Sequence, residues 1–158
     1  MSIEQLQPVL EKLLKLHKSL LELSDRKTGI VKKGDMDSLK SIIKEEQVHI
    51  AAIEKLNQER SRIAAASFPH MENASLTELA GMAGGPRQKQ LLEIREELIE
   101  VISRIKEHNR LNQQLINQSL QFINFSRSLV MPQQDNYNYG PPKGKAKSGG
   151  QGLFNSKA

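Results

Sequence analysis

The side chains best able to do chemistry in this 158-residue chain are four histidines and a few carboxylates, because the sequence contains no cysteine. The lack of cysteine excludes disulfides, thiolate metal sites and a cysteine nucleophile. Glu46 and His49 form one Glu-x-x-His motif, which in helical bundles supplies part of a di-iron site. Such a site needs a second copy of the motif, and the sequence has none. We therefore predict no metal site and no cofactor.

The sequence also gives little support for acid–base catalysis or for phosphate binding. The carboxylates of Glu45–Glu46 and of Glu96–Glu97 are adjacent in sequence, so on a helix the members of each pair point in different directions. The stretch 84–87 (Gly-Gly-Pro-Arg) precedes a predicted helix start, where phosphate can bind, but it lacks the P-loop spacing and a preceding strand. No nucleophile, base and orienting group can be assembled from these residues. The sequence therefore predicts a protein that is not an enzyme.

Composition favours long helices over a mixed globular fold. Aromatic residues make up 4% of the chain, tryptophan is absent, and leucine, isoleucine, glutamate, lysine and glutamine are abundant. No apolar run approaches the roughly 18 to 20 residues that span a bilayer, and the first residues lack the pattern of a signal peptide. We expect a cytoplasmic protein without direct membrane insertion.

The positive charge is concentrated near the C-terminus. Residues 133–158 contain four lysines and one aspartate, whereas the remaining chain carries 19 basic and 17 acidic side chains. The rest of the chain is nearly balanced, so the high overall isoelectric point is weak evidence for nucleic-acid binding, and we expect no nucleic-acid partner. The segment 133–158 is rich in glycine, proline and serine, and its composition predicts a disordered basic tail.

Hydrophobic spacing predicts two long helices, at about 2–33 and 36–66. The first carries an alternating three-and-four spacing that is typical of a coiled-coil seam, at Leu6, Val9, Leu13, Leu16, Leu20 and Leu23. Gly34 then supplies a helix stop, and either Asp35 or Asp37 supplies the cap of the next helix. So short a connection predicts an antiparallel helical hairpin.

A third helix, at about 87–131, is predicted after a linker at 67–86. Within the linker, Ser75 and Glu78 fit a capping box and indicate a short helix. The third helix starts after Pro86, ends before Pro132, and would span roughly 67 Å. Residues 1–132 thus form a helical domain. We predict an all-α fold: an elongated antiparallel coiled coil or three-helix bundle with a long third helix.

The third predicted helix is about 13 residues longer than each helix of the hairpin. Its C-terminal half carries two apolar stripes about 130° apart around the helix axis. Both stripes could be core of a three-helix bundle, or they could be exposed and bind a partner helix. Polar residues in this helix, including Asn112, weaken self-packing locally and set its register. One stripe is Leu111, Leu115, Phe122, Phe125 and Leu129, and the other is Ile116, Leu120, Ile123 and Val130. We predict that these nine residues bind the partner.

The sequence resembles the FlgN family of flagellar export chaperones over about residues 6–130. The resemblance rests on the leucine-rich first helix and on two further stretches. The second is Lys33-Gly-Asp-Met-Asp-Ser-Leu39, leading into Glu45-Glu46 and ending near Arg60; the third is Asn109-Arg-Leu-Asn112, followed by Leu115-Ile116, Ser119-Leu120 and Phe122-Ile123.

The resemblance implies a cytoplasmic chaperone for the hook–filament junction proteins FlgK and FlgL. Such a chaperone binds a C-terminal, helix-forming segment of its client, prevents premature assembly, and delivers the client to the export gate FlhA and the export ATPase. Aromatic residues near the end of the last helix are implicated in gate docking, and Phe122 is the positional candidate here, where some relatives have tyrosine. The alternative is a self-associating coiled-coil structural or adaptor protein.

Overall fold

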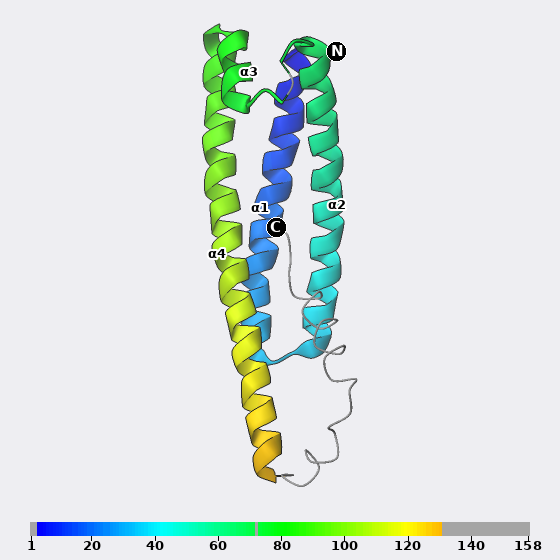
Figure 1. Ribbon diagram of the computed structural model, residues 1–158, viewed down its shortest axis with the longest axis vertical. Helices are drawn as coiled ribbons and strands as arrows, with labels where there is room; N and C mark the ends of the chain where they lie inside the picture. The colour runs from blue at the N-terminus through cyan, green and yellow to red at the C-terminus, as the bar shows by residue number, and fades with distance from the viewer. Residues whose placement is uncertain (1–2, 72, 131–158) are drawn as a thin grey trace.

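The computed structural model of the chain describes residues 3–71 and 73–130, and in these residues it contains helices and no strand. The elements are the 3-10 turn η1 (Ile3–Gln5) and the helices α1 (Leu6–Lys33), α2 (Met36–Ser67), α3 (Leu76–Ala83) and α4 (Gly85–Val130). They form an elongated bundle (Figure 1). The predicted all-α fold with a long last helix is therefore confirmed. The predicted tail at 133–158 lies outside the described residues.

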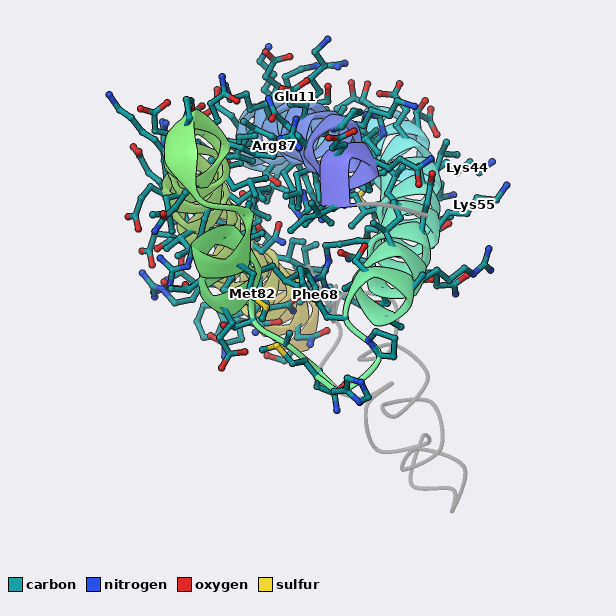
Figure 2. The ribbon with its side chains drawn as sticks, turned by 90° about the horizontal axis from the view of Figure 1, so that it is seen from above. Glu11, Lys44, Lys55, Phe68, Met82 and Arg87 are labelled. Atoms are coloured by element: carbon teal, nitrogen blue, oxygen red, sulfur yellow. The ribbon has the colours of Figure 1, made fainter. Side chains whose placement is uncertain are left out.

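The helix α1 is the centre of the bundle. It packs against α2 along one side and against α4 along another, while α2 and α4 make little contact with each other. Figure 2, which looks along the bundle, shows α2 and α4 on either side of α1. The helix α2 runs antiparallel to α1, α4 runs parallel to it, and the short α3 lies on the first turns of α4 (Figure 1). The bundle is therefore open on the side opposite α1.

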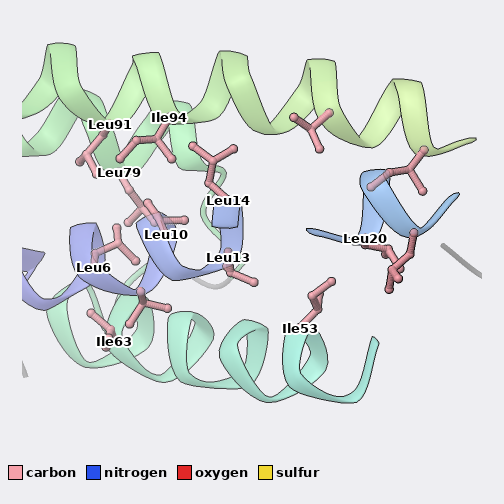
Figure 3. Close-up of a cluster of buried hydrophobic side chains, with 14 of the residues drawn as sticks. Leu6, Leu10, Leu13, Leu14, Leu20, Ile53, Ile63, Leu79, Leu91 and Ile94 are labelled. Carbon is pink, nitrogen blue, oxygen red and sulfur yellow. The ribbon is translucent and has the colours of Figure 1, made fainter. Parts of the chain in front are cut away.

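The core follows the leucine-rich face that the heptad spacing of α1 predicts. Leu6 and Leu10 are almost completely buried. Figure 3 shows them between Leu91 of α4 and Ile63 of α2, with Leu79 of α3 covering the same end. The short helix α3 thus closes the end of the core at which α1 and α4 begin.

The join between α1 and α2 has the predicted chemistry. Gly34 adopts a left-handed conformation with φ of 69°, and the amides of Gly34 and Asp35 donate to the last carbonyls of α1. The carboxylate of Asp35 accepts from the backbone amide of Ser38 at 3.1 Å and from its hydroxyl at 2.6 Å. These hydrogen bonds lower the pKa of Asp35 below its ordinary value. Two adjacent residues, Gly34 and Asp35, therefore end α1 and begin α2.

The predicted capping box also forms at the start of α3. The amide of Glu78 donates to the Ser75 hydroxyl at 3.2 Å, and the Glu78 carboxylate accepts from the Ser75 amide at 2.8 Å. Gly84, which has a φ of 64°, ends this helix, and α4 begins at the next residue. This tight return places α3 against α4.

A hydrogen-bonded polar contact joins α1 to α4 inside the apolar core. Asn112 is 1% exposed. Its Oδ1 accepts from the Thr28 hydroxyl at 2.6 Å, and its Nδ2 donates to the Ser24 carbonyl at 3.0 Å. Both polar ends of the amide have hydrogen-bond partners. The contact therefore favours one lengthwise register of α1 against α4.

A buried ion pair joins α1 to α2, and its lysine, Lys27, directly precedes Thr28 in α1. The Lys27 Nζ lies 3.1 Å from Glu46 Oε2, and both side chains are more than nine-tenths buried. The second carboxylate oxygen, Glu46 Oε1, is buried without a hydrogen-bond partner. The pair therefore specifies how the hairpin halves align, but it is incompletely satisfied.

We predict that Asn112→Asp destabilises the fold. The change keeps the shape of the side chain but turns the Nδ2 donor into an acceptor facing the Ser24 carbonyl, and it buries a charge. In urea unfolding at neutral pH, the free energy of unfolding should fall by more than about 2 kcal/mol. Asn117→Asp, an exposed site on the same helix, is the control and should change little. Equal losses in the two variants would show that the buried contact is unimportant.

We also predict that Lys27→Met destabilises the fold by about 3–5 kcal/mol, because it leaves the buried Glu46 carboxylate without its partner. The double variant Lys27→Met, Glu46→Leu should recover most of that loss. The exposed pair of Lys18 and Glu97, also at 3.1 Å, is a matched control, and Lys18→Met should lose less than about 1 kcal/mol. A double variant as unstable as the single one would contradict this account.

Candidate partner-binding surface

The buried contact of Thr28 with Asn112 determines how far α4 extends beyond the hairpin. Because α1 and α4 run parallel with these residues level, Lys33, the last residue of α1, lies level with Asn117. The helix α4 continues to Val130 (Figure 1). Residues 118–130, which we call the overhang, thus project roughly 20 Å past α1 and α2. This is the surplus that the predicted helix lengths indicate.

The nine residues predicted to bind a partner are divided by the structure. Ile116 is 7% exposed and belongs to the core, and Leu111 and Leu115 are half-buried beside it. The remaining six are exposed, including Phe122 at 70%: Leu120, Phe122, Ile123, Phe125, Leu129 and Val130. Core packing therefore accounts for three of the nine, and the overhang leaves the other six uncovered.

One exposed stripe continues the face of α4 that packs on α1. The buried residues Val101, Ile105, Asn112 and Ile116 have spacings of four, seven and four. From Ile116 the same repeat continues with spacings of four, three, four and three. It reaches Leu120, Ile123, Arg127 and Val130, which we call the inner seam. A helix bound there would take the place that α1 would occupy if it were longer.

The other exposed stripe lies on the far side of the overhang. It consists of Phe122, Phe125 and Leu129, which we call the outer stripe, and it continues the half-buried residues Leu111 and Leu115. Because the inner seam and the outer stripe are well over 90° apart on the helix, a single partner helix cannot bury both. The overhang therefore offers two separate apolar surfaces.

The overhang carries little charge. Between Leu111 and Val130 the only charged residue in the sequence is Arg127. The last charged residues before this stretch pair with each other, since Arg110 lies 2.7 Å from Glu107. That contact lowers the pKa of Glu107 and raises that of Arg110. An exposed helical surface with six large apolar side chains and one charge is typical of an interaction site.

The residues considered for metal binding do not assemble into a site. Glu46 is engaged by Lys27, and the His49 Nδ1 lies 2.9 Å from the Glu45 carbonyl of its own helix. Within residues 3–71 and 73–130, no group of three His, Asp or Glu side chains is placed to hold a metal ion. A cavity of about 250 Å³ between the three long helices is mainly apolar, lined in part by Leu20, Ile50, Ile53, Ile102 and Ile105. The rest of its lining consists of His17, Glu54 and Lys106.

Two functional features were missed by the sequence reasoning. Arg127 was not singled out, although the heptad spacing from Ile116 places it in the inner seam. The buried ion pair of Lys27 with Glu46 was not predicted either. Sequence spacing alone does not pair them, because Lys27 lies seven residues before Gly34 and Glu46 lies twelve residues after it.

The comparisons with known proteins agree with this architecture. The model of the FlgN protein family matches residues 1–147. The chain is also similar to the uncharacterized protein YvyG of Bacillus subtilis (strain 168), with 33% identity over 165 residues that cover all of both chains. No solved structure matches the chain. None of the helices in the described residues is both long and apolar enough to cross a membrane.

The family match covers both the hairpin and the whole of α4, including the overhang, so it extends over every element described above. The chain therefore belongs to the FlgN family, which indicates a chaperone role in the biogenesis of the bacterial flagellum.

Proposed function

We propose that the protein is a cytoplasmic, non-enzymatic export chaperone that binds a C-terminal helical segment of the hook–filament junction proteins FlgK and FlgL. By covering that segment it prevents premature assembly, and it delivers the client to the export gate FlhA and the export ATPase. The observation that carries the proposal is the overhang, where α4 presents six exposed apolar residues beyond the end of its own bundle.

The inner seam is the surface best suited to the client. It continues the spacing with which α4 already packs on a helix, so an amphipathic helix can dock there by the same knobs-into-holes contacts. Leu120 and Ile123 are about half exposed and lie next to the end of α1. A client helix on this seam would extend the α1–α4 pair, which supports a segment of three or four turns as the ligand.

The outer stripe is then left for the export gate. Phe122 and Phe125 point away from the side on which α1 packs, and both are well exposed. A chaperone that delivers its client must contact the gate while the client is still bound. Two surfaces on opposite sides of one helix satisfy that requirement, whereas a single surface would force the client and the gate to compete.

We predict that Leu120→Ala with Ile123→Ala weakens client binding. Each side chain contributes roughly 1.5–3 kcal/mol when fully buried, so the affinity for a C-terminal fragment of FlgK or FlgL should fall on the order of tenfold or more. Calorimetric titration measures this directly. The thermal melt should be unchanged because both residues are exposed. Unchanged binding would place the client elsewhere.

We predict the opposite pattern for Phe122→Ala with Phe125→Ala. Binding to the cytoplasmic domain of FlhA should be lost, while affinity for the client fragment stays within a few-fold of the wild type. A second double variant, Val48→Ala with Ile99→Ala, removes exposed apolar groups away from the overhang and should change neither interaction. If the two phenylalanines prove essential for the client instead, the division of the overhang into two surfaces is wrong.

The same experiments test the alternative function. A self-associating coiled-coil protein would pair these stripes with a second copy of the chain. Light scattering would then show a stable dimer that both overhang variants dissociate, and neither FlgK nor FlgL fragments would bind. That result would replace the chaperone proposal.

A further inference from the structure

Two buried polar contacts in this bundle join complementary groups on neighbouring helices. Asn112 is met by Thr28 and Ser24, and Lys27 is met by Glu46 at 3.1 Å. This is what the physics requires, because a buried polar or charged group without a partner is strongly unfavourable. The rule applies to any helix that continues the same seam.

Arg127 is a charged residue on that seam, and no helix within residues 3–71 and 73–130 lies beside it. It lies between Ile123 and Val130 in the heptad spacing that continues from Ile116. The helix α1 has already ended, since Lys33 is level with Asn117. Within the described part of the chain, Arg127 is exposed and forms no ion pair. A helix that covers the inner seam would therefore also enclose an unmatched guanidinium.

Building on the proposed function, we propose that the client helix carries an aspartate or glutamate that pairs with Arg127, and that this pair sets the register of the client on the inner seam. The ligand is thus an amphipathic helix with an apolar heptad seam interrupted by one acidic residue. Apolar contacts alone do not distinguish helix positions one heptad apart, whereas a single charge on an otherwise uncharged surface does.

The chemistry favours a carboxylate over other partners. An arginine guanidinium presents a planar set of donors that a carboxylate accepts in two parallel hydrogen bonds. A client with an apolar residue at that position would leave the guanidinium uncompensated, and one with lysine or arginine would be repelled. Specificity then arises from rejection of wrong helices as much as from attraction of the right one.

A simpler role for Arg127 is to stabilise its own helix. A cation in the last turn interacts favourably with the helix dipole, and Arg127 is the basic residue there. Lysine would serve that role equally well but cannot form the two-pronged contact. The variant Arg127→Lys therefore separates the two roles, and circular dichroism reports whether the helix itself is retained.

The test is calorimetric titration of the full chain with a C-terminal fragment of FlgK or FlgL. Arg127→Glu should lower the affinity on the order of tenfold or more, and Arg127→Lys should lower it several-fold with unchanged helix content. The matched control is Arg104→Glu, which makes the same charge change at an exposed site on α4 beside the bundle. Its affinity should stay within about twofold, since long-range effects are screened by salt.

A charge reversal in the client completes the test. Acidic residues of the fragment are replaced one at a time by lysine, and one of these variants should bind Arg127→Glu better than it binds the wild type. If no single reversal does so, or if Arg104→Glu weakens binding as much as Arg127→Glu, the proposed pair is wrong. If Arg127→Glu binds normally while Leu120→Ala with Ile123→Ala does not, the acidic pairing fails but the client surface stands. If both bind normally, the client binds away from the inner seam, whereas a wild-type chain that binds neither fragment would show that the proposed function itself is wrong.

Discussion

The hydrogen bond between Thr28 and Asn112 is the constraint on which the rest of the structure depends. Leucine and isoleucine seams tolerate a shift of one heptad, because apolar contacts after the shift resemble those before it. A buried amide bonded at both ends does not, since the shift would leave its polar atoms unpartnered. This contact aligns α1 with α4. It therefore decides which residues of α4 are core and which project beyond the bundle.

The consequence is visible at neighbouring positions of one stripe. Ile116 and Leu120 are one turn apart on the same face of α4, yet the first is buried and the second is about half exposed. Nothing in their own side chains explains the difference. It arises because α1 ends at Gly34, where a left-handed glycine and the Asp35 cap turn the chain back into α2. A turn thus creates the candidate surface on the overhang, which is more than eighty residues away in the sequence.

The sequence was sufficient for features that depend on local chemistry. The stop at Gly34, the capping box of Ser75 and Glu78, and the length surplus of α4 follow from residue types and spacing alone. The open arrangement did not follow, because a heptad pattern shows that a face is covered but not by which neighbour. The fate of the two stripes depended on the register between α1 and α4, and this was set by Thr28 and Asn112, which contact each other across 84 residues of sequence.

An overhanging helix has a further physical advantage for binding. Residues 118–130 lie past the end of α1, yet they are helical because they propagate from the packed part of α4, so the unfavourable nucleation step is already complete. Binding then needs to order only the client segment and not the surface that receives it, which leaves more of the contact energy as affinity. The same extension keeps the apolar residues of the inner seam and Arg127 in a fixed spacing. A rigid helix can therefore select a ligand by the position of the charge along it. An equally apolar but flexible tail could not do so.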